Sequence, residues 1–99
     1  GFMYVIDRAT GEVLSADAFD TVTAYHGVDL KTGRIIPNEE KKPETGKLVE
    51  NVCPAAPGAK DWQPTAWSPR TQYLYVPHQH LCMSFKASEV GYIAGTPYV

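Results

Sequence analysis

Residues 2–14 read FMYVIDRATGEVL, in which two runs of strand-forming residues flank a five-residue turn. The first run, Phe2 to Ile6, is rich in aromatic and β-branched side chains, which favour strands. In the turn, the carboxylate of Asp7 can accept hydrogen bonds from backbone N–H groups two residues on, and Gly11 can adopt a positive φ. The stretch therefore predicts a β-hairpin closed by a D-x-x-T-G turn.

The same turn pattern recurs twice. Residues 29–33 read DLKTG and are followed by RII, and residues 68–72 read SPRTQ and are followed by YLYV. In the third copy Ser68 replaces the aspartate and Gln72 replaces the glycine, which we expect to cost backbone free energy. The copies are unevenly spaced, yet repeated hairpins of this kind are typical of β-propeller blades, which are four-stranded sheets of roughly 40–50 residues.

Composition limits the class of protein. Hydrophobic residues make up 43% of the chain and charged residues 20%, so a disordered chain is excluded. The net charge is −2 and the chain has no basic stripe, so we expect no nucleic-acid partner. The longest apolar run is too short to predict a membrane span. Eight glycines and eight prolines favour short strands joined by tight turns, and the predicted class is all-β.

The expected architecture is about two blades of a propeller. Because closed propellers have about four to eight blades, two blades alone would expose apolar faces and open sheet edges. The chain also begins at a predicted strand, Gly1-Phe2, and stops in another, Tyr98-Val99. We therefore predict that residues 1–99 form one partial propeller domain, truncated at both ends.

The two cysteines, Cys53 and Cys82, do not form a CxxC pair. A disulfide between them would stabilise the fold by about 3–4 kcal/mol, because closing a loop of this length lowers the entropy of the unfolded chain. It would also imply an oxidising compartment. Two buried free thiols are the alternative, and both interpretations fit the sequence.

Two histidines alternate with one of these cysteines, as His78, His80 and Cys82. On a strand all three side chains would share one face and could form a soft metal site. However, Pro77 indicates a strand edge or a loop, and a disulfide-bonded cysteine cannot act as a thiolate ligand. Exposed or hydrogen-bonded histidines are the favoured interpretation, and no metal ligand is assigned.

Residues 58–64 read GAKDWQP and form the most unusual segment. Asp61 and Trp62 stand side by side in this Gly/Pro-rich loop, which could present a polar group and a flat aromatic ring to a planar ligand. A turn aspartate beside a packed tryptophan is the alternative. The chain has no nucleophile elbow, phosphate loop, H-E-x-x-H motif or dinucleotide fingerprint.

Five segments, taken in order, resemble the large subunits of methanol and ethanol dehydrogenases that depend on pyrroloquinoline quinone (PQQ). They are YVIDRATG at 4–11, VDLKTG at 28–33, NVCPAAPGAKDWQP at 51–64, WSPRT at 67–71 with LYVP at 74–77, and YIAGTP at 92–97. A single D-x-x-T-G turn is a weak signal, but five segments in one order cover essentially the whole chain. Members that use a lanthanide in place of calcium look especially similar.

The resemblance implies a parent enzyme that is an eight-bladed propeller of roughly 600 residues, located in the periplasm. PQQ would sit on its axis beside a calcium or lanthanide ion. The parent would oxidise a primary alcohol, with methanol favoured, to the aldehyde by hydride transfer to PQQ. Electrons would then pass to a c-type cytochrome, and the parent would be a homodimer or a larger assembly.

The resemblance assigns few residues of this chain to the site. It implies a structural disulfide between Cys53 and Cys82, and cofactor-binding roles for Asp61 and, beside it, Trp62. The catalytic base, the metal ligands and a pair of adjacent cysteines that caps PQQ in the family are not in this chain and are expected mostly upstream of Gly1. We therefore predict that the isolated chain has no dehydrogenase activity.

Two other classes compete with this interpretation. A non-catalytic propeller scaffold with PQQ-like repeats, which would bind a protein partner, shares the hairpins but has no reason to keep the cysteine pair or the 58–62 loop. A sugar-oxidising quinoprotein is disfavoured by the 51–64 segment. One departure from the family is that Leu14 and Ile36 occupy positions where its docking repeats usually carry an aromatic residue.

Overall fold

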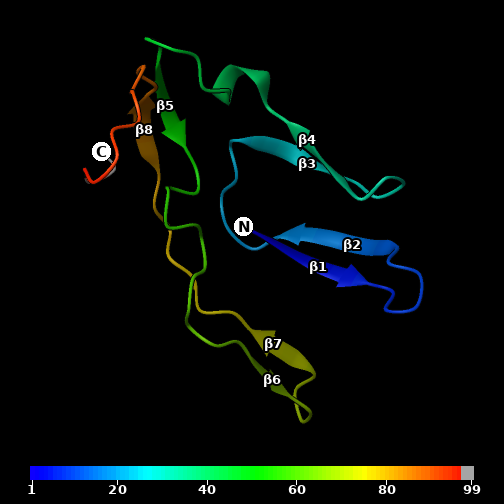
Figure 1. Cartoon of the computed structure of the whole chain (residues 1–99). Coiled ribbons are helices and arrows are strands. Elements are labelled where there is room, and N and C mark those ends of the chain that lie inside the picture. Colours follow the sequence, from blue (N-terminus) through cyan, green and yellow to red (C-terminus); the bar gives the residue numbers. More distant parts are fainter. Residues whose placement is uncertain (97–99) are drawn as a thin grey trace.

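The computed structural model describes residues 1–96, and in that range it consists of short strands and one 3₁₀ turn (Figure 1). The predicted strand at Tyr98-Val99 lies outside the described residues. In chain order the elements are β1 (Phe2–Ile6), β2 (Val13–Ala18), β3 (Tyr25–Asp29), β4 (Arg34–Pro37), η1 (Glu39–Lys41), β5 (Leu48–Val52), β6 (Ala66–Ser68), β7 (Tyr73–Tyr75) and β8 (Met83–Lys86).

Three antiparallel hairpins, β1–β2, β3–β4 and β6–β7, form at the three predicted turns. In each turn the N–H of the fifth residue donates to the C=O of the first. These bonds are Gly11 to Asp7 at 2.8 Å, Gly33 to Asp29 at 2.7 Å and Gln72 to Ser68 at 2.8 Å. The turn geometry is therefore the same in all three hairpins.

The first residue of each turn also accepts hydrogen bonds with its side chain. The Asp7 carboxylate accepts from the N–H of Ala9 at 2.8 Å and of Thr10 at 2.9 Å. The bonds from Thr10 and then Ala9 lower the pKa of Asp7. In the third turn the hydroxyl of Ser68 accepts a single longer bond, 3.3 Å, from the N–H of Thr71. Aspartate thus holds this turn with more hydrogen bonds than serine does.

The fifth turn residue has a left-handed backbone in every copy. The φ angle is 79° at Gly11, 69° at Gly33 and 58° at Gln72. Gln72 therefore adopts the conformation that glycine supplies in the other two turns, as the sequence predicts.

A fourth pair, β5–β8, is not a hairpin, because the whole β6–β7 hairpin is inserted between its two strands. Figure 1 shows β5–β8 beside η1, with β6–β7 at the far end of the molecule. The result is elongated, with extents of 52 × 29 × 27 Å and a radius of gyration of 17.1 Å. A compact domain of this length has a radius of gyration of about 13 Å.

The all-β class is confirmed, but the four sheets have only two strands each. The four-stranded sheet of a complete blade does not form within residues 1–96, although β2 and β3 lie against each other. Each pair therefore keeps unpaired edges. Within the same residues, no helix is long and apolar enough to cross a membrane.

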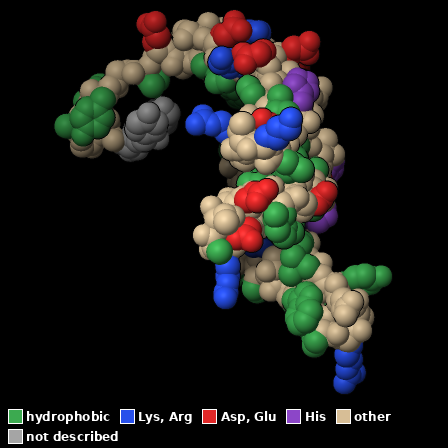
Figure 2. Space-filling view, turned by 90° about the vertical axis from the view of Figure 1, so that its right-hand side faces the viewer, with side chains coloured by type: hydrophobic (Ala, Val, Ile, Leu, Met, Phe, Trp, Pro, Cys, Tyr) green, Lys and Arg blue, Asp and Glu red, His purple; other side chains and the backbone are tan. Residues whose placement is uncertain are grey.

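Few side chains are buried. Val49, Val52, Cys53 and Ala59 are the buried apolar residues, at 2–6% exposure. The accessible surface is 7853 Å², against about 5,600 Å² for a compact protein of this mass. Figure 2 shows apolar side chains standing out from the lower end of the molecule, where β6–β7 lies. The hairpins thus have exposed apolar faces, and the small core lies on β5 and in the loop that follows it.

Candidate functional site

Three connecting segments that are far apart in the sequence contact one another, and we call this region the loop junction. It comprises residues 19–23, 53–61 and 77–82. The second and third segments are joined by a disulfide between Cys53 and Cys82, with Cα atoms 4.4 Å apart. Two backbone hydrogen bonds of 2.8 Å continue the connection, from Ala55 to Leu81 and from Gln79 to Ala59. The disulfide that the resemblance implies is therefore present, and the interpretation as free thiols is wrong.

Thr23 fixes the first segment to the second. The backbone N–H of Thr23 donates to the carbonyl of Cys53 at 2.9 Å. In return, the N–H of Cys53 donates to the hydroxyl oxygen of Thr23 at 2.8 Å. The same hydroxyl donates to the carbonyl of Asn51 at 2.7 Å. Because all these groups lie next to the buried Cys53, the bonds tie the β2–β3 connection to the disulfide.

Asp20 fixes the first segment to the third. Its carboxylate lies 2.6 Å from Nδ1 of His80 and 3.6 Å from Nδ1 of His78, and its side chain is only 5% exposed. The hydrogen bond from His80 lowers the pKa of Asp20 most; burial opposes this shift, and the N–H of Thr21 adds to it. The ring of Phe19 meets that of His78 edge to face at 6.0 Å between centroids.

His80 is therefore hydrogen-bonded to Asp20, and Nδ1 of His78 lies 3.6 Å from the same carboxylate, so the two histidines do not stand together on a strand face. Residues 77–82 are not a strand, because their backbone groups bond to the Cys53–Ala59 loop and not to a ladder. Cys82 is held in the disulfide. No group of three potential metal ligands comes together anywhere in residues 1–96. Sequence reasoning missed Asp20, since nothing near it indicates a partner about sixty residues away.

Of the predicted cofactor-binding residues, Asp61 is the last residue of the 53–61 segment of the junction and Trp62 comes directly after it. The loop turns at Gly58, with φ 79°, buries Ala59 and then emerges at Asp61. The backbone N–H of Asp61 donates to Gln63 at 3.3 Å, while its carboxylate makes no hydrogen bond or ion pair with any residue in 1–96. Trp62 is 80% exposed, so it does not pack as a buried tryptophan against residues 1–96. A carboxylate and an indole are thus both accessible to a ligand.

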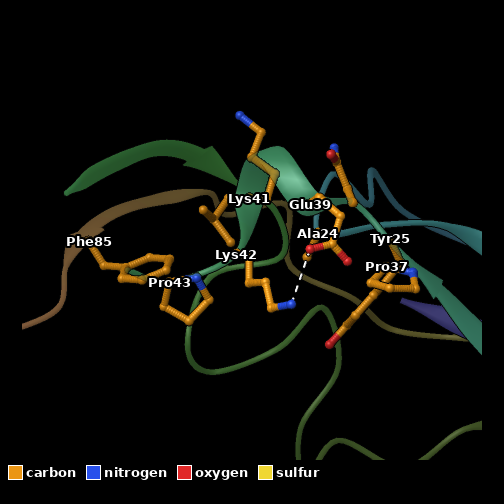
Figure 3. Close-up of a pocket in the computed structure, with 10 residues that line it drawn as sticks. Ala24, Tyr25, Pro37, Glu39, Lys41, Lys42, Pro43 and Phe85 are labelled. Atoms are coloured by element: carbon orange, nitrogen blue, oxygen red, sulfur yellow. Dashed lines mark hydrogen bonds and ion pairs between the residues drawn. The ribbon is translucent and has the colours of Figure 1, made fainter. Parts of the chain in front are cut away.

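A hollow of about 440 Å³ lies elsewhere, between η1, the ends of the β3–β4 hairpin, and β5–β8. Figure 3 shows its apolar side, formed by Phe85 and Pro43, and an ion pair between Lys42 and Glu39. The two charged atoms of that pair are 3.1 Å apart. Neither Asp61 nor Trp62 lines the hollow, so it is separate from the site that the sequence predicts.

Known proteins match the whole chain. It is 43% identical over 108 residues to a lanthanide-dependent methanol dehydrogenase of Methylorubrum extorquens, covering 100% of this chain and 18% of that protein. A quinoprotein ethanol dehydrogenase of Pseudomonas putida is 41% identical over 107 residues, covering 100% of this chain and 17% of that protein. The solved structure of a europium-containing methanol dehydrogenase superposes with a TM-score of 0.88 at 38% identity, over 99% of this chain and 17% of that one. No protein-family model matches the chain.

These matches make the chain homologous, along its whole length, to a segment of the quinoprotein alcohol dehydrogenases. Within that class, lanthanide-dependent methanol dehydrogenases are among its similar relatives, including one from Methylacidiphilum fumariolicum at 38% identity. The hairpins correspond to part of the propeller of a methanol dehydrogenase. The matches that include all of this chain cover only 16–18% of the length of the curated relatives.

Proposed function

We propose that this chain is a segment of a periplasmic PQQ-dependent dehydrogenase that oxidises a primary alcohol, with methanol favoured, and passes the electrons to a c-type cytochrome. The observation that carries the proposal is the match of the whole chain to a europium-containing methanol dehydrogenase, at a TM-score of 0.88 and 38% identity. We call the longer protein the parent protein, and a homodimer or larger assembly of it is part of the proposal.

The exposed apolar surface supports a segment within a larger propeller. The accessible area of 7853 Å² exceeds that of a compact protein of equal mass by about 2,000 Å². That excess is more than the area of about 800 Å² that one partner buries in a standard protein interface. Neighbouring blades would cover this surface, which supports the proposal that residues 1–99 are one partial domain, truncated at both ends. The Cys53–Cys82 disulfide supports a periplasmic location for the parent protein, because the periplasm is an oxidising compartment.

The geometry of the 58–62 loop fits a planar, polar cofactor. The carboxylate of Asp61 can accept a hydrogen bond from the edge of PQQ, and the exposed indole of Trp62 can line the same pocket. When bound, PQQ supplies the acceptor for the hydride of the alcohol. A calcium or lanthanide ion would be held by residues of the parent protein outside this chain, because residues 1–96 bring no three ligands together.

The test is alcohol oxidation by the purified parent protein, reconstituted with PQQ and either calcium or a lanthanide, with a dye as electron acceptor. We expect metal-dependent oxidation of methanol or another primary alcohol. Asp61→Ala should weaken PQQ binding by about tenfold or more, since a hydrogen bond to a charged group is lost. Asp61→Asn keeps one acceptor oxygen and should lose less, and Asp17→Asn, at an exposed position on β2, is the matched control.

A parent protein that binds no PQQ and oxidises no alcohol with either metal would overturn the proposal. Dehydrogenase activity of the 99-residue chain alone, with PQQ and metal added, would overturn the separate prediction that the isolated chain is inactive, because catalysis would then not need residues of the parent protein outside this chain.

A further inference from the structure

We infer that Gln79, together with Asp20 and His80, is a positioning brace for the 58–61 loop, which sets where the Asp61 carboxylate stands. The inference rests on the proposed function, in which Asp61 binds PQQ. It gives a role in the site to three residues beyond Asp61 and Trp62.

The first link of the brace joins Gln79 to the loop. Its backbone N–H donates to the carbonyl of Ala59 at 2.8 Å, and its side-chain Nε2 donates to the carbonyl of Gly58 at 3.2 Å. Ala59 is 2% exposed, so its carbonyl is held in a packed position two residues before Asp61. One residue thus satisfies two successive carbonyls of the loop.

No other hydrogen bond ties this part of the loop to a distant segment within residues 1–96. The bond from Gly58 to Ala55 and the bond from Lys60 to the Asp61 carbonyl are both local. The disulfide acts at Cys53, eight residues before Asp61. Gln79 is therefore the last long-range hydrogen-bonded support before the candidate cofactor residues.

The second link holds Gln79 itself. The neighbours on either side of it, His78 and His80, both engage the carboxylate of Asp20, at 3.6 and 2.6 Å between the nearest atoms. Because the Asp20 side chain is only 5% exposed, loss of His80 would leave a largely buried carboxylate without its 2.6 Å partner. The 77–80 segment is thus clamped on both sides of Gln79.

Rigid support by residues that do not touch the ligand is how proteins fix a ligand group. If the brace is released, Asp61 must be ordered at the moment of binding, and affinity falls. Loss of such supporting residues typically lowers affinity at metal sites by about 10–100-fold, and we expect about tenfold here.

The experiment uses the full-length parent protein and two readouts for each variant. The first is the dissociation constant of PQQ for the metal-loaded apoprotein, measured by equilibrium dialysis. The second is hydrogen exchange of the peptide that covers residues 56–62, followed by mass spectrometry. The variants are Gln79→Met, which keeps the side-chain length but loses the Nε2 donor, Asp20→Ala and Asp20→Asn. Asp17→Asn and His26→Ala are the controls, at exposed positions on β2 and β3.

We expect Asp20→Ala to weaken PQQ binding about tenfold and Gln79→Met to weaken it several-fold. Both should exchange faster in residues 56–62 while β1–β2 exchanges as before, whereas a merely structural role would loosen β1–β2 as well. Asp20→Asn keeps an acceptor oxygen for His80 and should restore most of the affinity. The controls should behave as wild type.

Wild-type PQQ affinity and wild-type exchange in Gln79→Met overturn the inference, and this variant decides the matter if Asp20→Ala does not fold. If Asp61→Ala weakens binding while the brace variants do not, the proposed function stands and the inference fails. If Asp61→Ala binds PQQ normally, the cofactor role of Asp61 fails, and faster exchange in 56–62 alone still identifies the brace.

Discussion

Replacing Gln72 by glycine should stabilise the β6–β7 hairpin. Gln72 has a φ of 58°, in the left-handed region where Gly11 and Gly33 stand in the two equivalent turns. A residue with a Cβ atom costs about 1–2 kcal/mol there. Glycine removes that cost but adds about 0.5–1 kcal/mol of backbone entropy in the unfolded chain. The net gain is about 0.5–1 kcal/mol, which raises the folding equilibrium constant about two- to fivefold.

A peptide spanning residues 64–77 is the suitable assay, because the hydrogen bonds of this hairpin and its turn lie within residues 66–75. An isolated two-stranded hairpin is marginally stable, so a change of this size gives a measurable change in its population. NMR should show stronger cross-strand contacts between Trp67 and Leu74, which are paired in the structure. Gln72→Ala is the control, since alanine has the same backbone penalty and should leave the population near that of wild type. An equal or lower population in the glycine peptide would refute the reasoning.

Three further predictions concern the parent protein. Gly33→Ala should destabilise the β3–β4 hairpin by at least about 1–2 kcal/mol, since φ is +69° and the new Cβ would lie 3.1 Å from Cγ2 of Val13; an unchanged thermal midpoint would contradict this. Reducing the Cys53–Cys82 disulfide, or replacing both cysteines by serine, should cost about 3–4 kcal/mol in denaturant unfolding, and no loss would show that the closed loop does not constrain the unfolded chain. The lowered pKa of Asp20 means that its stabilisation is present above the ordinary value of 3.8 and is lost as pH falls through the lower folded pKa. Asp20→Asn should therefore flatten the plot of unfolding free energy against pH below about pH 4. A plot identical to that of wild type would show that Asp20 does not contribute to the loss of stability in acid.

The sequence predicts the three hairpins well because their turns are local. The hydrogen bonds that close each turn join residues at most five apart, so Asp7, Thr10 and Gly11 carry the information within one segment. Even the exception at Gln72 follows the pattern of the other copies. By contrast, the β5–β8 pair joins strands separated by a whole hairpin, and no local feature marks it.

The loop junction escapes prediction for the same reason. The alternation of His78 and His80 and the loop indicated by Pro77 are visible in the sequence, but the Cys53–Ala59 loop that takes the backbone hydrogen bonds of this segment is not. Their common partner, Asp20, lies about sixty residues away and has no local signal. The exposure of Asp61 and Trp62 agrees with a ligand site, yet the identity of the ligand comes from the family resemblance and not from the physics of the loop.

The most direct test of the central claim, that this chain is a segment of a quinoprotein alcohol dehydrogenase, is to sequence the DNA on both sides of its coding region. Since the chain is 16–18% of the length of its relatives, we predict an open frame of about 600 codons. It should contain an export signal and, upstream of Gly1, adjacent cysteines and an acidic residue. A frame that closes near residues 1 and 99, or that continues without those residues, would contradict the account.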